Sequence, residues 1–110
     1  MSDTAPAVVT RYLAAADAGD LPTLADCFAP DGTVLDEGRT YRGRGEIIGW
    51  REALAGTWTY TSSVTASEPV SAQVYRVNVR VEGDFPGGVA DLTYRFTLRE
   101  GLIEDLSIVG

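Results

Sequence analysis

Apolar side chains recur every three or four residues along the first part of the chain, over residues 8–16 and again over residues 21–28. This spacing is typical of two amphipathic helices, each with one buried face. Asp3 or Thr4 can cap the first helix, and Gly19 suits the left-handed backbone that ends it. The pattern predicts two short antiparallel helices that lead into a strand.

The next part of the chain combines a short strand with a third helix. Asp20 can cap the second helix, and the Ala-Pro-Asp-Gly run at 29–32 predicts a turn after it. Residues 33–37 then predict a strand, and residues 38–45 predict a loop that carries three solvated arginines. Apolar spacing over 46–55 predicts the third helix.

From residue 58 onward, the hydrophobic pattern changes from helical spacing to alternation. Apolar and polar side chains alternate over 58–64, 75–82 and 91–99, as expected for antiparallel strands with one covered face and one wet face, and residues 102–109 predict the last strand. Turn-forming residues interrupt the alternation at 67–69, 84–88 and 100–101. Helices first and strands second indicate an α+β fold, with three helices packed into the concave face of a strongly curved antiparallel sheet. The wide end of such a sheet is left open, and we expect a ligand pocket there.

The composition narrows the functions that this fold can carry. A length of 110 residues fits one domain, and the net charge of −7 repels nucleic-acid backbones and anionic membranes. The chain has no apolar run long enough to span a membrane, no secretory signal pattern and one cysteine, Cys27, which together predict a cytoplasmic protein without an intrachain disulfide. Because histidine is absent, the usual metal ligand and the Ser-His and Cys-His pairs are absent as well. Acid–base chemistry then depends on carboxylates, tyrosines and arginines, and we expect neither a metal nor a cofactor.

Several short motifs follow one another along the chain. They are Arg-Tyr-Leu at 11–13, Asp-Ala-Gly-Asp-Leu at 17–21, Phe-Ala-Pro-Asp-Gly-Thr-Val at 28–34, Gly-Arg-Gly-Glu-Ile at 43–47, Glu-Gly-Asp-Phe-Pro-Gly-Gly at 82–88 and Tyr-Arg-Phe-Thr-Leu-Arg-Glu-Gly-Leu-Ile at 94–103. This series resembles the nuclear transport factor 2-like superfamily, which includes the steroid isomerases and the SnoaL-like polyketide cyclases. The resemblance implies a cone-shaped α+β barrel over residues 1–110, a pocket for a small apolar organic ligand, and a homodimer formed through the outer sheet face.

The resemblance also implies a catalytic set. Asp36 falls where the steroid isomerases carry the general base, and Tyr12 falls where they carry the tyrosine that donates to the developing enolate oxygen. The second donor of those enzymes is a protonated aspartic acid, and Tyr94 takes its place in this chain. Other roles are open at these positions. Tyr12 can be a core residue whose hydroxyl reaches water, and Asp36 can cap the following loop or pair with Arg39 or Arg42.

Aromatic side chains in the predicted third helix and strands are candidates for the pocket wall, because most of them combine an apolar ring with a polar tip. The candidate substrate-binding residues are Trp50, Trp58, Tyr60, Tyr75 and Phe96. Each of them can instead belong to the packed core.

Three functions from different classes fit these observations. The first is a cofactor-independent isomerase, cyclase or dehydratase that transfers a proton next to the carbonyl of a small apolar substrate. The second is a non-catalytic carrier or sensor of a hydrophobic small molecule. The third is an interaction module whose sheet is filled by its own side chains. The resembled superfamily contains isomerases, cyclases, dehydratases, epoxide hydrolases and binding proteins, so the function has to be argued from the site.

Overall fold

The first helix ends and the second helix begins where local sequence signals place their caps. In the computed structural model, which describes residues 5–110, the helices are α1 (Ala7–Ala18), α2 (Leu21–Asp26) and α3 (Arg44–Thr57). Gly19 ends α1 in the left-handed conformation with a φ angle of 71°, and the Asp20 carboxylate accepts a hydrogen bond from the Thr23 backbone N–H at 3.3 Å. Both of these predictions are confirmed, while the predicted caps Asp3 and Thr4 lie outside the described residues. No helix within residues 5–110 is long and apolar enough to cross a membrane.

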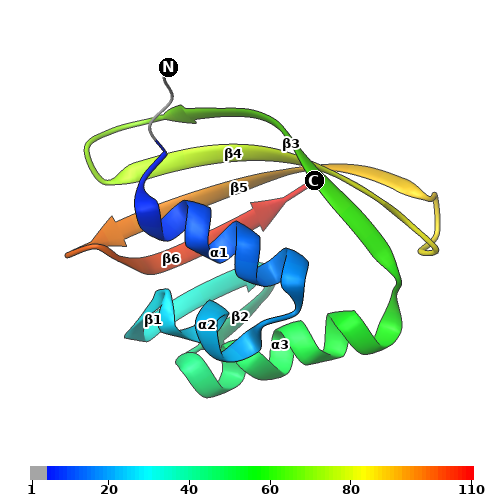
Figure 1. The fold of residues 1–110 in the computed structure, drawn as a ribbon, viewed down its shortest axis with the longest axis horizontal. Helices are drawn as coiled ribbons and strands as arrows, with labels where there is room; N and C mark the ends of the chain where they lie inside the picture. The colour runs from blue at the N-terminus through cyan, green and yellow to red at the C-terminus, as the bar shows by residue number, and fades with distance from the viewer. Residues whose placement is uncertain (1–4) are drawn as a thin grey trace.

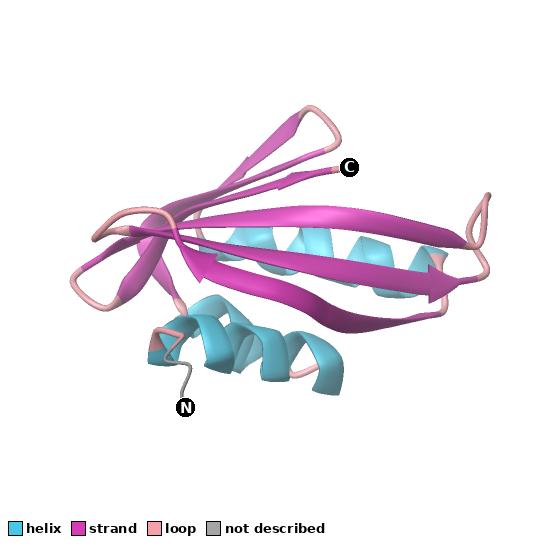
Figure 2. Cartoon of the chain, turned by 90° about the horizontal axis from the view of Figure 1, so that it is seen from above, coloured by secondary structure: helices cyan, strands magenta, loops and turns pink. Residues whose placement is uncertain are grey.

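Within the described residues, six strands form one curved and unclosed sheet. They are β1 (Phe28–Asp36), β2 (Arg39–Arg42), β3 (Tyr60–Pro69), β4 (Val74–Gly83), β5 (Val89–Arg99) and β6 (Leu102–Val109), in the spatial order β2-β1-β6-β5-β4-β3. Neighbouring strands pair antiparallel, except that β1 and β6 pair parallel. The long strands arch over α1 and α2 (Figure 1), and Figure 2 shows how strongly the sheet twists. The predicted α+β fold, with three helices against a curved sheet, is confirmed.

A segment that the sequence assigns to a turn belongs to β1. The predicted turn at 29–32 is wrong, because these residues continue the strand through a shift in its pairing with β6 between Phe28 and Thr33. Gly32 suits this irregular stretch, since a Cβ atom on it would lie 3.0 Å from the Ile103 backbone oxygen of β6. The proline and glycine that suggest a turn therefore mark an irregular strand.

The predicted loop at 38–45 is also wrong. β2 pairs with β1 in a hairpin, and the two connecting residues, Glu37 and Gly38, have positive φ angles of 53° and 77°. Arg44 starts α3, and its guanidinium donates two hydrogen bonds to the Phe28 carbonyl oxygen, at 2.7 and 3.0 Å. This arginine therefore ties α3 to β1 instead of lying in a solvated loop.

β3 is the strand at one edge of the sheet, and it contributes to the pocket described below. It runs from Tyr60 to Pro69, so the predicted break at 67–69 is wrong. A proline is tolerated there because an edge strand does not use every backbone N–H for pairing.

The apolar faces of the helices and strands meet in one core. The Tyr12 ring of α1 packs edge-on against Phe28 and Phe96, with ring centroids 5.8 and 5.5 Å apart. On the outer face of the sheet, Arg80 of β4 and Asp91 of β5 form an ion pair at 2.9 Å. The predicted alternation is therefore confirmed for these two strands, and the homodimer through the outer face stays a prediction.

Candidate functional site

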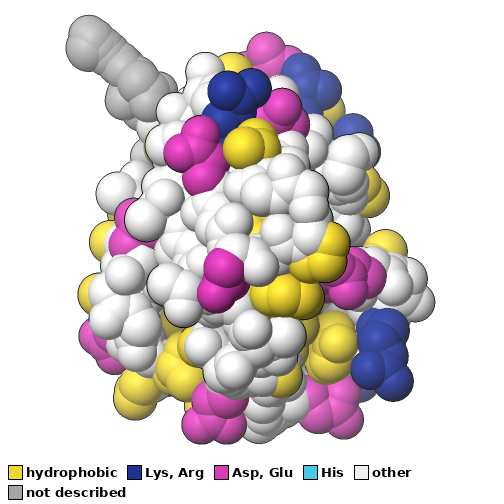
Figure 3. All heavy atoms as spheres, turned by 90° about the vertical axis from the view of Figure 1, so that its right-hand side faces the viewer, with side chains coloured by type: hydrophobic (Ala, Val, Ile, Leu, Met, Phe, Trp, Pro, Cys, Tyr) yellow, Lys and Arg dark blue, Asp and Glu magenta, His cyan; other side chains and the backbone are white. Residues whose placement is uncertain are grey.

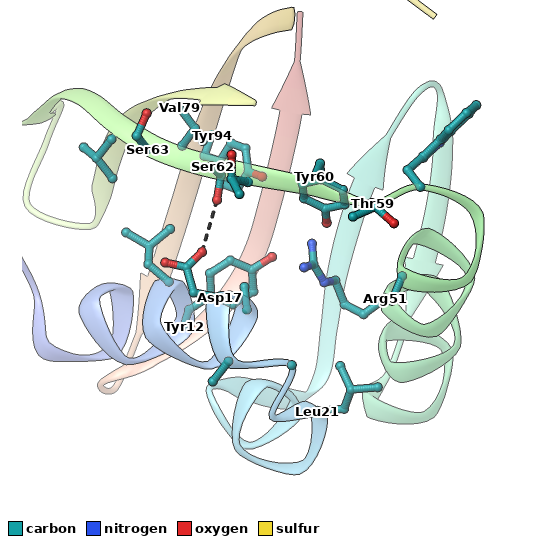
Figure 4. A pocket seen from close by; sticks show the side chains of 18 residues that line it. Tyr12, Asp17, Leu21, Arg51, Thr59, Tyr60, Ser62, Ser63, Val79 and Tyr94 are labelled. Atoms are coloured by element: carbon teal, nitrogen blue, oxygen red, sulfur yellow. Dashed lines mark hydrogen bonds between the residues drawn. The ribbon is translucent and has the colours of Figure 1, made fainter. Parts of the chain in front are cut away.

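A pocket of about 640 Å³ lies between the helices and the edge of the sheet. Its wall is formed by the second half of α1, the start of α2, the second half of α3 and the first half of β3 (Figure 4). Leu13, Leu21 and Val79 give this wall apolar surface, and Thr59 and Ser62 add hydroxyl groups. A pocket of this size and mixed lining suits a small organic molecule with a few polar atoms.

Tyr12 lies at the inner end of the pocket. The helical spacing that buries Val8 and Val9 on α1 also turns Tyr12 inward, and its exposed fraction is 0%. Its hydroxyl has no hydrogen-bond partner among residues 5–110. Burial raises the pKa of the Tyr12 phenol well above its usual value, so the group is a neutral donor at physiological pH. A buried donor without an acceptor costs free energy of folding, and here the acceptor can only come from a ligand or water.

Tyr94 of β5 contributes a second phenol to the pocket wall. The strand alternation turns it inward beside Phe96, and their ring centroids are 6.2 Å apart. Burial raises the pKa of Tyr94 to about 12, while the charge of Arg51 acts in the opposite direction. Tyr94 therefore also stays neutral and able to donate a hydrogen bond. The structure brings two of the three predicted catalytic residues to the same pocket.

Asp36, the predicted base, lies at the end of β1 and is only partly buried. The Trp50 indole N–H donates a hydrogen bond to its Oδ2 at 3.0 Å. Asp36 is not among the residues that line the pocket, although its charge adds to the effect of burial in raising the pKa of both Tyr12 and Tyr94. The charge of the Asp36 carboxylate therefore acts on the two phenols from outside the pocket wall.

The five predicted substrate-binding residues divide into two groups. Trp58 and Tyr60, at the end of α3 and the start of β3, line the pocket. The other three do not line it. Trp50 is buried behind Asp36, Phe96 packs in the core against Tyr12, and Tyr75 lies further along the sheet, where its hydroxyl donates to Ser67 Oγ at 3.4 Å.

Two charged residues of the pocket are absent from the sequence-based prediction. Arg51 of α3 points its guanidinium into the pocket, and the hydroxyls of Tyr12 and Tyr60 point toward it (Figure 4). Asp17 of α1 accepts a hydrogen bond from the Ser62 hydroxyl at 3.1 Å. Helical periodicity assigns Arg51 to the solvent side of α3, since it directly follows the buried Trp50. Only the position of α3 relative to β3 shows that this side faces a pocket.

The described residues hold no cluster of three or more histidine, cysteine, aspartate or glutamate side chains that could bind a metal ion. The chemistry that the pocket offers is therefore that of phenols, hydroxyls, one guanidinium and one carboxylate.

Comparisons with known proteins find relatives over nearly the whole chain. The model of the SnoaL-like domain matches residues 9–106. Protein SMa1630 from Sinorhizobium meliloti, provisionally assigned as a polyketide cyclase, is 33% identical, with a TM-score of 0.91 over 96% of this chain and 95% of that chain. A comparison with curated proteins finds no match.

Two solved structures of lower identity share the fold. A Catenulispora acidiphila protein with a ketosteroid isomerase-like fold, in complex with trimethylamine, is 22% identical, with a TM-score of 0.86 over 97% of this chain and 87% of that chain. Rv0760c from Mycobacterium tuberculosis, in complex with estradiol-17beta-hemisuccinate, is 14% identical, with a TM-score of 0.81 over 97% and 95% of the two chains. The resemblance that the sequence motifs suggest is confirmed.

Proposed function

The chain belongs to the SnoaL-like family, and on that basis we propose that it is a pocket protein that binds a small, mostly apolar molecule through a carbonyl oxygen. The observation that carries this proposal is the Tyr12 hydroxyl, which is buried at the inner end of the pocket and has no partner among the described residues. The neutral phenol of Tyr94 adds a second donor. Two donors suit a carbonyl oxygen, because it has two lone pairs.

Calorimetric titration with the methyl ketone 2-acetonaphthone tests this proposal. We expect Tyr12→Phe to weaken binding about ten-fold, because a hydrogen bond to an otherwise unsatisfied buried donor is lost. Tyr75→Phe is the matched control, since its hydroxyl bonds to Ser67 outside the pocket and its removal should leave the affinity unchanged. The absence of binding to the wild-type protein, or equal affinities for wild type and Tyr12→Phe, contradicts the proposal.

A second candidate function is proton transfer next to the bound carbonyl, with Asp36 as the base. It is favoured by Asp36, whose carboxylate is held by the Trp50 indole and whose charge acts on both phenols. Tyr12 and Tyr94 would then stabilise the enolate oxygen that forms when Asp36 removes a proton from the neighbouring carbon. This reaction requires the substrate to reach Asp36 from the pocket, or the Asp36 side chain to turn toward it.

Hydrogen exchange of the methyl group of 2-acetonaphthone in heavy water, followed by NMR, measures this reaction directly. The wild-type protein should accelerate the exchange. Asp36→Asn should abolish the acceleration but keep ligand affinity and melting temperature, because an asparagine oxygen can still accept the Trp50 hydrogen bond. If the Asn variant exchanges as fast as wild type, Asp36 is not the base. If wild type binds the ketone without accelerating exchange, the protein is a carrier or sensor.

A further inference from the structure

Arg51 places a positive charge in the pocket that no carboxylate neutralises. Its side chain is partly buried on α3, and no acidic group within residues 5–110 lies within ion-pair distance of it. Its Nε–H is buried and has no acceptor among the described residues. The Trp50 ring covers one face of the guanidinium, 5.3 Å from the ring centroid to Cζ, and Tyr60 is a hydrogen-bond partner of the same group, so the Nε–H edge is the part left without an acceptor.

The groups around Arg51 in the pocket are phenols. The phenols of Tyr12, Tyr60 and Tyr94 line the same pocket, and Figure 4 shows the Tyr12 and Tyr60 hydroxyls pointing toward the guanidinium. Burial lowers the pKa of Arg51, but these phenols raise it, and the net shift is upward. A guanidinium is fully protonated at neutral pH, so its charge remains uncompensated inside the pocket. Charges held away from water in this way are normally paired.

Asp17 is the other charged residue on the pocket wall. It lies in the last turn of α1, is exposed, and its Oδ1 already accepts a hydrogen bond from Ser62. It therefore belongs to the outer part of the pocket, whereas the unpaired Nε–H of Arg51 and the unpaired Tyr12 hydroxyl are both buried.

We infer that the natural ligand of this pocket carries a carboxylate, which binds Arg51 and the Tyr12 hydroxyl. The inference rests on the proposed binding function and names its ligand class. A carboxylate matches the fork of N–H groups on a guanidinium and accepts hydrogen bonds from phenols as well. The apolar body of the ligand would lie against Leu13, Leu21 and Trp58.

The negative charge of the rest of the protein means that a preference for a carboxylate can come only from contacts inside the pocket. The net charge of the chain is −7, and Figure 3 shows acidic side chains spread among hydrophobic ones on the side of the molecule where α1 and α3 end. Long-range attraction therefore does not recruit an anion. Selection of a carboxylate has to come from short contacts inside the pocket, which salt screens less than surface charges.

A pair of isosteric probes tests the inference. The anion 2-naphthoate and the neutral ketone 2-acetonaphthone share the ring system and differ in the group that would reach Arg51. We expect calorimetry to show that wild type binds the anion at least about ten-fold more tightly than the ketone. Arg51→Gln should remove this preference, because it should weaken binding of the anion far more than binding of the ketone.

Two further variants separate the effect of the Arg51 guanidinium from the effect of the protein's net charge. Arg95→Gln changes the net charge equally on the exposed outer face of β5, and it should keep the preference for the anion. Arg51→Lys keeps the charge without the fork of donors, so it should bind 2-naphthoate with intermediate affinity, and it serves as the test if the Gln variant does not fold.

The outcomes distinguish this inference from the proposed function. Equal affinities of wild type for the two probes overturn the carboxylate inference and leave pocket binding intact. An equal loss of anion affinity in the Arg51 and Arg95 variants also overturns it, because the effect would then come from net charge. If neither probe binds, the proposed function fails together with the inference.

Discussion

Tyr12 has a hydroxyl that its own surroundings leave without a partner, and this has a consequence for stability. We expect Tyr12→Phe to leave the free energy of unfolding unchanged or to raise it by up to about 1 kcal/mol, because the substitution removes an unsatisfied buried donor and keeps the ring. Tyr75→Phe loses the hydrogen bond to Ser67 and should lower the same quantity by roughly 0.5–1 kcal/mol. Urea unfolding measures both variants. A clear loss of stability in Tyr12→Phe would show that the hydroxyl has a structural partner.

The two buried phenols also predict how stability depends on pH. Burial raises the pKa of Tyr94 from 10.0 to about 12 and raises that of Tyr12 in the same direction, so the folded protein holds these protons more tightly than the unfolded chain does. Their contribution to stability is complete below about pH 10 and is lost as the pH rises toward about 12. We expect the free energy of unfolding to fall over this range, and to fall less in Tyr94→Phe. An absorbance titration in which all tyrosines ionise near pH 10 would contradict this prediction.

Sequence patterns predict some of the site residues but not others. Tyr12 and Tyr94 reach the pocket because helical and strand periodicity determine which side chains turn inward, and periodicity is visible in the sequence. The charge of Asp36 acts on both of them, but its hydrogen bond to Trp50 joins residues from different elements and could not be predicted. The place of Arg51 in the pocket could not be predicted for the same reason. Its role depends on which element faces α3 across the pocket, and one sequence does not contain that information.

At the scale of elements, the junction between α3, β3 and β4 shapes the pocket mouth through Gly83. A Cβ atom on Gly83 would collide with the Thr59 carbonyl oxygen and lie 2.5 Å from Tyr60 Cβ, and Thr59 and Tyr60 both line the pocket. We expect Gly83→Ala to lower the free energy of unfolding by about 2 kcal/mol and to weaken ligand binding as well.

Gly49 in α3 is the matched control, because a Cβ atom there meets no other atom within 4 Å. Gly49→Ala should raise the free energy of unfolding by roughly 1 kcal/mol, as alanine favours the helix over glycine. Thermal or urea unfolding compares the two variants. Changes of the same sign would mean that the space around these glycines differs from that described.

Two of the errors in the predicted elements have different physical causes. Proline and glycine at 29–32 read as a turn, but the neighbouring strand β6 imposes an irregular strand there, and Gly32 accommodates its close approach. The sequence predicts a loop in place of the β1–β2 hairpin because the turn residues, Glu37 and Gly38, are not one of the common hairpin pairs. Where hydrophobic periodicity was strong, as in α1, β4 and β5, the predicted elements are confirmed.

For the molecule as a whole, the curved sheet and the three helices enclose a core at one end and leave a pocket beside the edge strand β3. This arrangement separates two tasks. Phe28, Phe96 and the buried valines of α1 stabilise the fold, while Tyr12 and Arg51 hold polar groups that have no hydrogen-bond partner among the described residues. The proposed function therefore requires that a ligand binds in this pocket.

An amide NMR titration of the isotope-labelled protein with 2-acetonaphthone tests this claim most directly. We expect the largest shift changes on residues that line the pocket, in the second half of α1, the end of α3 and the first half of β3, and we expect Tyr12→Phe to reduce them. Residues of the outer sheet face, such as Arg80 and Asp91, should not move. Shift changes centred on that outer face, or none at saturating ligand, would contradict the account.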